Sequence, residues 1–274
     1  MLDALQATGA NENTIVIFSS DHGDMQGAHG GFHEKWHNAY EETLRVPFIV
    51  SSPLLPGGPR ELDVPTSHAD LIPTVLGLAG IDPEDALNRL QADHTDARPL
   101  VGRDLADVIR GDAPSAAAEP VLFMTDDEIS EGAEKGASPT RGLARRLKVL
   151  ATVEQPNHIE TVVARIPVDG EEHLVKFSRY HDNPQFWTVP AQRDERLRGR
   201  KTITVTEPEA DEHELYDLTL DPTEERNLAH PANATDSSRA LHETMLALLR
   251  EELDAKRRTP SAGAVPGYRP PVTV

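Results

Sequence analysis

The chain has 274 residues, of which 27 are Lys or Arg and 46 are Asp or Glu, so its formal net charge is −19. A balance this acidic argues against a protein that binds nucleic acid through phosphate neutralisation, and we expect no nucleic-acid partner. No apolar run approaches the ~20 residues that span a bilayer, and the absence of Cys excludes disulfides, thiolate metal sites and a Cys nucleophile.

The first elements predict an α/β domain. Residues 1–7 resemble the end of a helix that stops at Gly9. The continuous β-branched and aromatic run 14–18 is typical of a strand buried on both faces of a parallel sheet. A second strand is expected over 45–50, with Pro47 near its start, where a missing N–H is tolerated.

A helix is predicted over residues 68–79, because apolar side chains recur there at helical spacing and Thr66 or Ser67 can cap it. From about residue 111 short alternating segments predict an antiparallel sheet with polar turns. Its expected strands are 121–124, 147–153, 159–166 and 173–180, and 128–142 is expected to be an exposed loop. An amphipathic helix is predicted over 237–257.

These patterns divide the chain into three parts. Residues 1–112 form an α/β part, and residues 119–258 form a smaller α+β subdomain after a small-residue, Pro-containing linker. Residues 259–274 contain four prolines and little to bury, which predicts a flexible Pro-rich tail.

Asp21 and His22 follow the first strand directly. Polar residues at the carboxyl end of such a strand lie at the crevice where open α/β sheets bind ligands. A carboxylate beside an imidazole can bind a divalent cation, although Asp-His-Gly also fits an ordinary turn.

A loop rich in Gly and His continues from this strand end. It contains His29, His33, Lys35 and His37. Lys35 is the most informative of them, because its ammonium is a poor metal ligand and a good partner for a sulfuryl or phosphoryl oxygen. The histidines alone fit either metal ligands or solvated loop residues.

Three segments carry a resemblance to a known family: residues 14–50, 66–80 and 214–229. They resemble, in the same order, parts of the second half of the catalytic domain and the C-terminal subdomain of sulfatases in the alkaline phosphatase superfamily. The resemblance implies a partial alkaline-phosphatase-like sheet with flanking helices. It also implies a smaller C-terminal antiparallel sheet packed with a long helix.

Carried over residue by residue, the resemblance implies that Asp21 and His22 are metal ligands and that Lys35 binds the sulfate of the substrate. The usual metal of the family is Ca²⁺, which prefers oxygen ligands, and the imidazole of His22 keeps Mn²⁺ or another metal open. His33 and His37 are additional candidates without a secure counterpart. Glu41 and Glu42 are expected to cap a turn or form salt bridges.

The nucleophile of the family has no counterpart in this chain. In the family it is a formylglycine made from the Cys or Ser of a Cys/Ser-x-Pro-x-Arg string, and the nearest string, 137–141, has Ala in that place. We therefore expect the formylglycine only in a preceding N-terminal half. The remaining sheet would expose an edge that this segment or a partner covers.

The predicted function is metal-assisted hydrolysis of a small-molecule or carbohydrate sulfate ester, with the chain doubtfully active alone. Two alternatives stay open: a phosphonate monoester or phosphodiester hydrolase of the same superfamily, and a non-catalytic truncated module that binds a metal or an anion. The sequence leaves the substrate alcohol, the oligomeric state and the localisation open.

Overall fold

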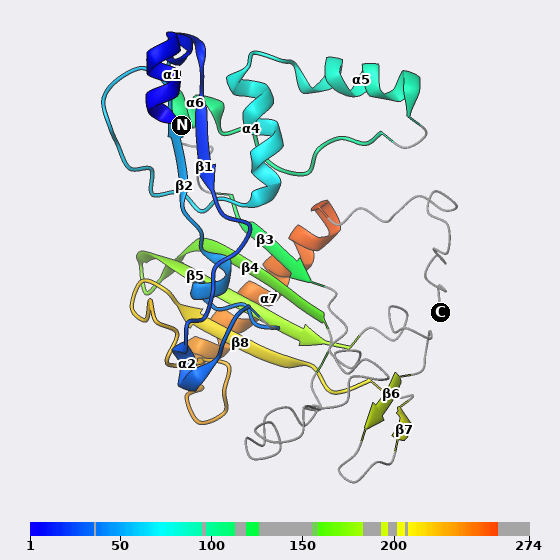
Figure 1. Ribbon diagram of the computed structural model, residues 1–274. Coiled ribbons are helices and arrows are strands. Elements are labelled where there is room, and N and C mark those ends of the chain that lie inside the picture. The colour runs from blue at the N-terminus through cyan, green and yellow to red at the C-terminus, as the bar shows by residue number, and fades with distance from the viewer. Residues whose placement is uncertain are drawn as a thin grey trace, which may run out of the picture.

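The computed structural model describes residues 1–35, 37–94, 97–112, 119–125, 156, 158–182, 193–196, 202–205 and 208–256. Short helices surround a two-stranded sheet in the N-terminal part, and a larger antiparallel sheet with one long helix forms the C-terminal part (Figure 1). No helix among these residues is long and apolar enough to cross a membrane.

The N-terminal part is built from short elements. They are α1 (Leu2–Thr8), η1 (Ala10–Asn13), β1 (Val16–Ser19), α2 (Ala28–Gly31), α3 (Glu41–Leu44), β2 (Phe48–Ser51), η2 (His68–Asp70), α4 (Leu71–Leu78), α5 (Pro83–Asp93) and α6 (Ala106–Arg110). As predicted, α1 ends at Gly9, which adopts the left-handed conformation at φ 73°. The predicted helix over 68–79 is also confirmed, as η2 followed by α4, with the Ser67 side chain accepting the N–H of Ala69.

The expected parallel pairing of the first strand is wrong among the described residues. β1 and β2 pair antiparallel, with Phe18 opposite Ile49. Among its described residues the segment between them, residues 20–47, holds only the one-turn helices α2 and α3, whereas a parallel pair is usually joined by a longer helix that packs on the sheet. Phe18 and Ile49 are 59% and 56% exposed, so β1 is not buried on both faces.

The C-terminal sheet contains β3 (Val121–Thr125), β4 (His158–Val168), β5 (Glu171–His181) and β8 (Glu212–Asp217), in the order β3-β4-β5-β8. All neighbours pair antiparallel, which confirms the strands predicted at 121–124, 159–166 and 173–180. Asp169 and Gly170 join β4 to β5 with φ values of 51° and 91°, as a tight hairpin turn requires. A separate pair, β6 (Arg193–Arg196) and β7 (Thr202–Val205), lies apart from this sheet.

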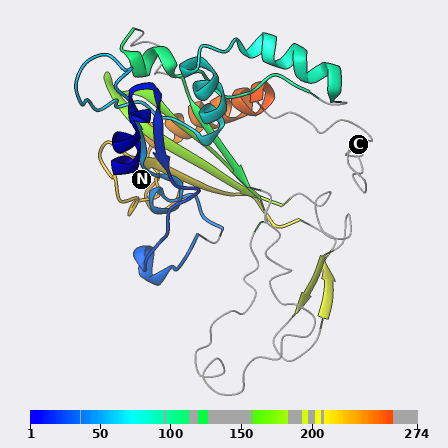
Figure 2. The same cartoon turned by 45° about the horizontal axis from the view of Figure 1, so that its top comes forward.

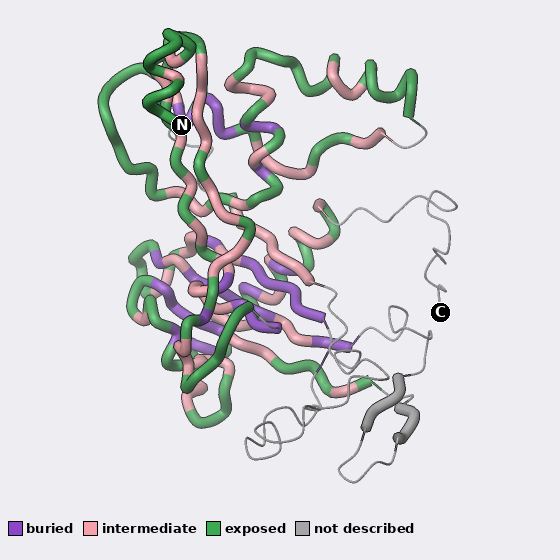
Figure 3. The backbone as a smooth tube through the Cα atoms, viewed as in Figure 1, coloured by how far each residue is buried: buried purple, intermediate pink, exposed green. Residues whose placement is uncertain are grey.

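One face of the sheet packs against α7 (Asp236–Lys256), the predicted amphipathic helix. The main core is Val162, Ala164, Val175, Phe177, Leu215, Met245 and Leu249. Because side chains alternate along a strand, Lys176 and Tyr180 of β5 point to the opposite face. The segment with α2 and α3 lies over that face in both views (Figures 1 and 2). Buried residues concentrate in this sheet (Figure 3).

Some predictions fall outside the described residues: the strand over 147–153, the loop over 128–142 and the tail over 259–274. The domain boundaries at 1–112 and 119–258 stay a prediction. Individual hydrogen bonds and salt bridges join the two parts. For example, Glu41 forms a salt bridge with Lys176, and Tyr40 donates a hydrogen bond to Glu214.

Candidate active site

Asp21 and His22 lie side by side at the end of β1. Oδ2 of Asp21 is 3.5 Å from Nε2 of His22, and Oδ1 accepts the backbone N–H of His22 at 3.0 Å. The Asp21 side chain is 83% exposed. Hydrogen bonding from the N–H of His22 lowers the pKa of the Asp21 carboxyl below its usual value, so this group is an anion at neutral pH.

The ring of His22 is oriented by its own backbone neighbour. Its Nδ1 is 2.7 Å from the carbonyl oxygen of Gly23. A carbonyl oxygen only accepts hydrogen bonds, so Nδ1 carries the proton and Nε2 keeps a free lone pair in the neutral ring. His22 therefore presents a ligand nitrogen beside the Asp21 oxygen.

This donor pair fits a divalent cation. Two ligand atoms about 2.4 Å from an ion and at right angles lie about 3.4 Å apart, which follows from ordinary coordination distances. The separation of 3.5 Å between Asp21 Oδ2 and His22 Nε2 matches that spacing. Because Ca²⁺ takes ~6–8 ligands, these two atoms would supply only part of its coordination.

The end of β1 is held from two sides. The N–H of Gly23 donates to the carbonyl of Thr43 in α3 at 2.8 Å, and a Cβ atom at Gly23 would overlap the carbonyl oxygen of Glu42. On the other side, Nε2 of His68 lies 2.8 Å from the carbonyl oxygen of Ser20. Only glycine allows the close approach of α3 at this position.

Lys35 follows a loop whose two ends are joined by a backbone hydrogen bond. Met25, which is 1% exposed, donates its N–H to the carbonyl of Glu34 at 2.9 Å. This bond brings the backbone next to Lys35 beside a residue only a few positions after His22. The Lys35 side chain is exposed. Left-handed φ values at His29 (49°) and Glu34 (62°) show that the loop is held in a strained path.

The two additional histidines differ in environment. His33 is exposed. His37 is buried, and its Nε2 lies 2.5 Å from the carbonyl oxygen of Pro156, while its ring meets Tyr180 edge-on at 6.0 Å. His37 thus contacts the C-terminal sheet and the residue that leads into it.

A second group of ligand atoms joins His29, Glu42 and Glu224, all within 4.8 Å of one another. Sequence reasoning missed it, because Glu224 lies far along the chain in no ligand motif. Glu224 already pairs with the ammonium of Lys176 at 2.5 Å, which balances the charge of the carboxylate without a metal. The expected salt bridges of Glu41 and Glu42 are confirmed, with Lys176 at 3.1 Å and with His29 at 3.3 Å when that imidazole is protonated.

A half-buried carboxylate, Glu214, lies among three tyrosines next to this group. Tyr40 and Tyr180 donate hydrogen bonds to Glu214 at 3.3 and 2.8 Å. Burial raises the pKa of Glu214, despite these hydrogen bonds. Burial, together with the charge of Glu214, raises the pKa of Tyr40 to about 12 and raises the pKa values of Tyr180 and Tyr216 as well.

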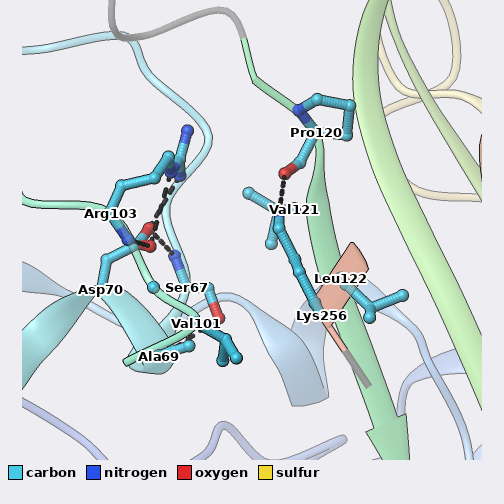
Figure 4. Close-up of a pocket in the computed structure, with 10 residues that line it drawn as sticks. Ser67, Ala69, Asp70, Val101, Arg103, Pro120, Val121, Leu122 and Lys256 are labelled. Atoms are coloured by element: carbon cyan, nitrogen blue, oxygen red, sulfur yellow. Dashed lines mark hydrogen bonds and ion pairs between the residues drawn. The ribbon is translucent and has the colours of Figure 1, made fainter. Parts of the chain in front are cut away.

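A small pocket lies where η2 and the segment 101–103 approach β3 and α7 (Figure 4). Arg103 donates to Asp70 at 2.7 Å, and Lys256 donates to the carbonyl of Pro120 at 3.0 Å. Burial raises the pKa of Asp70, but hydrogen bonds from Arg103 and from the N–H of Ser67 outweigh it and lower the pKa overall. Both cations are thus used to join elements of the fold.

Comparison with known proteins gives a consistent picture. Residues 1–81 match the family model described as Sulfatase. The chain is 32% identical over 127 residues to an ulvan-active sulfatase of Formosa agariphila, an alignment that covers 45% of this chain and 22% of that protein. This chain therefore matches less than a quarter of that relative's length.

Solved structures show the same fold. The structure of BT4656 with its substrate D-glucosamine-2-N,6-O-disulfate is similar at a TM-score of 0.54 and 19% identity, over 93% of this chain and 37% of that one. The phosphonate monoester hydrolase of Agrobacterium radiobacter is similar at a TM-score of 0.52 and 23% identity, over 98% of this chain and 42% of that one. The predicted α/β fold class is confirmed.

Proposed function

Because residues 1–81 identify this chain as a member of the sulfatase family, we propose that it supplies part of the catalytic domain of a metal-assisted sulfate ester hydrolase. The observation that carries the proposal is the facing pair of ligand atoms, Asp21 Oδ2 and His22 Nε2, at the carboxyl end of β1. Their separation of 3.5 Å is the spacing that two ligand atoms of one divalent cation would take.

In this proposal Asp21 and His22 hold a divalent cation, most simply Ca²⁺, with Mn²⁺ as the alternative that an imidazole ligand favours. The bound cation would withdraw charge from the oxygens of the transferring group. Asp21 contributes a permanent negative charge, and the carbonyl of Gly23 fixes the His22 tautomer that presents Nε2. His33 is exposed and stays an additional candidate, whereas we leave His37 out because its Nε2 meets the carbonyl of Pro156.

Lys35 is proposed to bind the sulfate. An ammonium on an exposed loop can approach an anionic substrate, and its three donors suit the non-bridging oxygens, on which negative charge rests throughout the reaction. The bond between Met25 and Glu34 brings the end of the loop next to a residue four positions after Asp21, which supports a shared site for Lys35, Asp21 and His22.

The chain offers no residue for a formylglycine. It contains no Cys, and the string 137–141, with Ala in the place of the nucleophile, lies outside the described residues. We therefore derive no nucleophilic step from this chain. We propose that the nucleophile, and cover for the exposed pair Phe18 and Ile49, come from a segment or partner beyond these residues.

We propose a carbohydrate sulfate ester as the substrate class. The name of one relative supports this choice, since it is an ulvan-active sulfatase. The structure of the phosphonate monoester hydrolase is similar at a level that speaks to fold alone, so it favours no second function.

The test is hydrolysis by the protein expressed from its complete reading frame. Sulfated monosaccharides and 4-nitrophenyl sulfate are assayed beside a phenylphosphonate monoester and bis(4-nitrophenyl) phosphate, with added Ca²⁺ or Mn²⁺. Preferred turnover of the sulfate esters supports the proposal. Preferred turnover of the phosphorus esters would assign the chain to that reaction instead. Metal binding without any turnover would make it a non-catalytic module.

A further inference from the structure

A buried ion pair lies on the sheet face opposite α7. Lys176, in the middle of β5, is 1% exposed, and its Nζ lies 2.5 Å from Oε1 of Glu224 and 3.1 Å from Oε1 of Glu41. The Glu224 side chain is fully buried. Burying two charges is unfavourable unless they pair and their remaining atoms are hydrogen-bonded. Removing one partner of such a pair would leave the other charge buried and unpaired, so the pair can hold the segments that carry it together.

Glu224 is itself held in a fixed, strained position. Its φ is 55°, in the left-handed region that residues other than glycine rarely adopt. The turn before it is closed by Asp221, whose carbonyl accepts the N–H of Glu224 and whose carboxylate accepts those of Glu225 and Arg226. The surrounding loop therefore over-determines where the Glu224 carboxylate points.

The second carboxylate oxygen of Glu224 connects the ion pair to the segment that contacts the end of β1. Oε2 accepts the backbone N–H of Glu41 at 2.6 Å, at the first residue of α3. The carbonyl of Thr43, in the same single turn, accepts the N–H of Gly23 at 2.8 Å. Gly23 directly follows His22, so two hydrogen bonds and one helical turn lead from the buried pair to the ligand pair.

Tyr40, the residue before α3, makes further contacts that hold this segment on the sheet. The ring of Tyr40 stacks on His29 with centroids 3.8 Å apart and an interplanar angle of 11°, and its hydroxyl donates to Glu214. His29 and α3 therefore pack together against the same face of β5 and β8. A displacement of α3 would carry the end of β1 with it, because Gly23 leaves no gap against Glu42.

We propose that Lys176 and Glu224 are positioning residues that fix the ligand pair at the end of β1 on the C-terminal sheet. The functional part of this inference rests on the metal-binding role proposed above for Asp21 and His22. Neither Lys176 nor Glu224 touches the ligand pair. They act through the backbone of Glu41 and Thr43.

The first test is amide hydrogen exchange, measured by NMR on the chain without metal. Glu224→Ala removes both contacts, and Glu224→Gln keeps an acceptor for Glu41 but loses the charge. Asp211→Asn is the matched control, because Asp211 pairs with Arg179 of the same sheet at 2.7 Å while 43% exposed. We expect exchange at Glu41 and Gly23 to rise at least tenfold in Glu224→Ala, with the amides of β5 unchanged.

Two exchange results would overturn the proposal. Faster exchange at Glu41 alone would mean that the pair holds one residue and transmits nothing to Gly23. An equal rise across β5 and α3 would mean that the pair only stabilises the fold. If Glu224→Ala does not fold, Glu224→Gln and Lys176→Met decide the question, with a smaller rise expected in Glu224→Gln.

The second test titrates Mn²⁺ and follows broadening of the His22 ring signals. The Mn²⁺ concentration at which half of the broadening is reached is expected to rise at least tenfold in Glu224→Ala and to stay constant in Asp211→Asn. A constant midpoint in Glu224→Ala would contradict positioning of the ligands. No broadening in the unsubstituted chain would contradict the metal site itself, and the exchange data, taken without metal, keep that failure separate from the coupling.

Discussion

The backbone N–H of Gly23 donates to the carbonyl oxygen of Thr43 at 2.8 Å, which joins the end of β1 to the single turn α3. We expect Gly23→Ala to destabilise the protein by ~1–3 kcal/mol, because the new methyl group overlaps the backbone of Glu42 and neither segment can yield freely. Urea denaturation measures the change. Gly58→Ala is the control, since a Cβ there meets nothing within 4 Å; equal effects of the two substitutions would contradict the close approach.

Asp21→Asn is expected to weaken Mn²⁺ or Ca²⁺ binding at least tenfold, because an amide oxygen replaces a charged ligand. Isothermal titration calorimetry measures the affinity. Asp24→Asn serves as the control, since Asp24 is an exposed carboxylate that accepts the N–H of Gln26 at 2.9 Å in the adjoining turn. Unchanged affinity in Asp21→Asn would make Asp21 a turn residue and nothing more.

Lys35→Ala, made in the protein from the complete reading frame, should lower sulfate ester turnover ~10²-fold, as expected when a charge aimed at the transferring group is lost. The thermal midpoint should stay unchanged because the side chain is exposed. Arg45→Ala removes another exposed cation, ten positions along the chain, and should leave kcat/KM near the original value. Similar turnover in the Lys35 and Arg45 variants would remove Lys35 from the site.

Asp70→Asn should cost about 3 kcal/mol at pH 7, because Arg103 would be left buried without its anion. The pKa of Asp70 is lowered in the folded state, so its stabilising effect is present above the unfolded value near 3.8 and is lost as the pH falls through the folded value. Urea denaturation at pH 7 and at pH 3 should therefore show that the difference in the free energy of unfolding between the variant and the original protein is smaller at pH 3. A constant difference would contradict the ionic role. Asp107→Asn, at an exposed pair with Arg110, is the control.

Tyr40→Phe tests the tyrosine group at high pH. Folding raises the pKa of Tyr40 from 10 to about 12, so its contribution to stability is complete below pH 10 and is lost as the pH rises through 12. The variant should lose stability less steeply than the original chain between these values, as measured by urea denaturation at fixed pH. Parallel curves for the two proteins would show that Tyr40 titrates normally.

Local signals predicted much of this fold. The Gly9 stop, the Ser67 cap, the alternation along β4 and β5 and the apolar stripe of α7 are each decided by residues close in sequence. The pairing direction of β1 was predicted wrongly, because an apolar run reports burial and leaves the path of the intervening chain open.

In the candidate site, too, some residues could be predicted from the sequence and others could not. Asp21, His22 and Lys35 were found from short-range pattern and resemblance, and their roles stay predictions. The Lys176, Glu41 and Glu224 cluster could not be found, because residues far apart in sequence meet only through the fold. A Lys in an alternating strand and a Glu in a polar turn carry no sign of burial. The left-handed φ of Glu224 is equally invisible in the sequence.

The hydrogen bond from Glu41 to Glu224 joins residues 183 positions apart. At a synthesis rate of about 5–20 residues per second, about 10–40 s separate the appearance of these two partners at the ribosome. During that interval α3 has no carboxylate to receive its first N–H, and Gly23 has no fixed turn to bind. The ligand pair at the end of β1 is thus made early and reaches its final position only after the loop behind β8 has emerged.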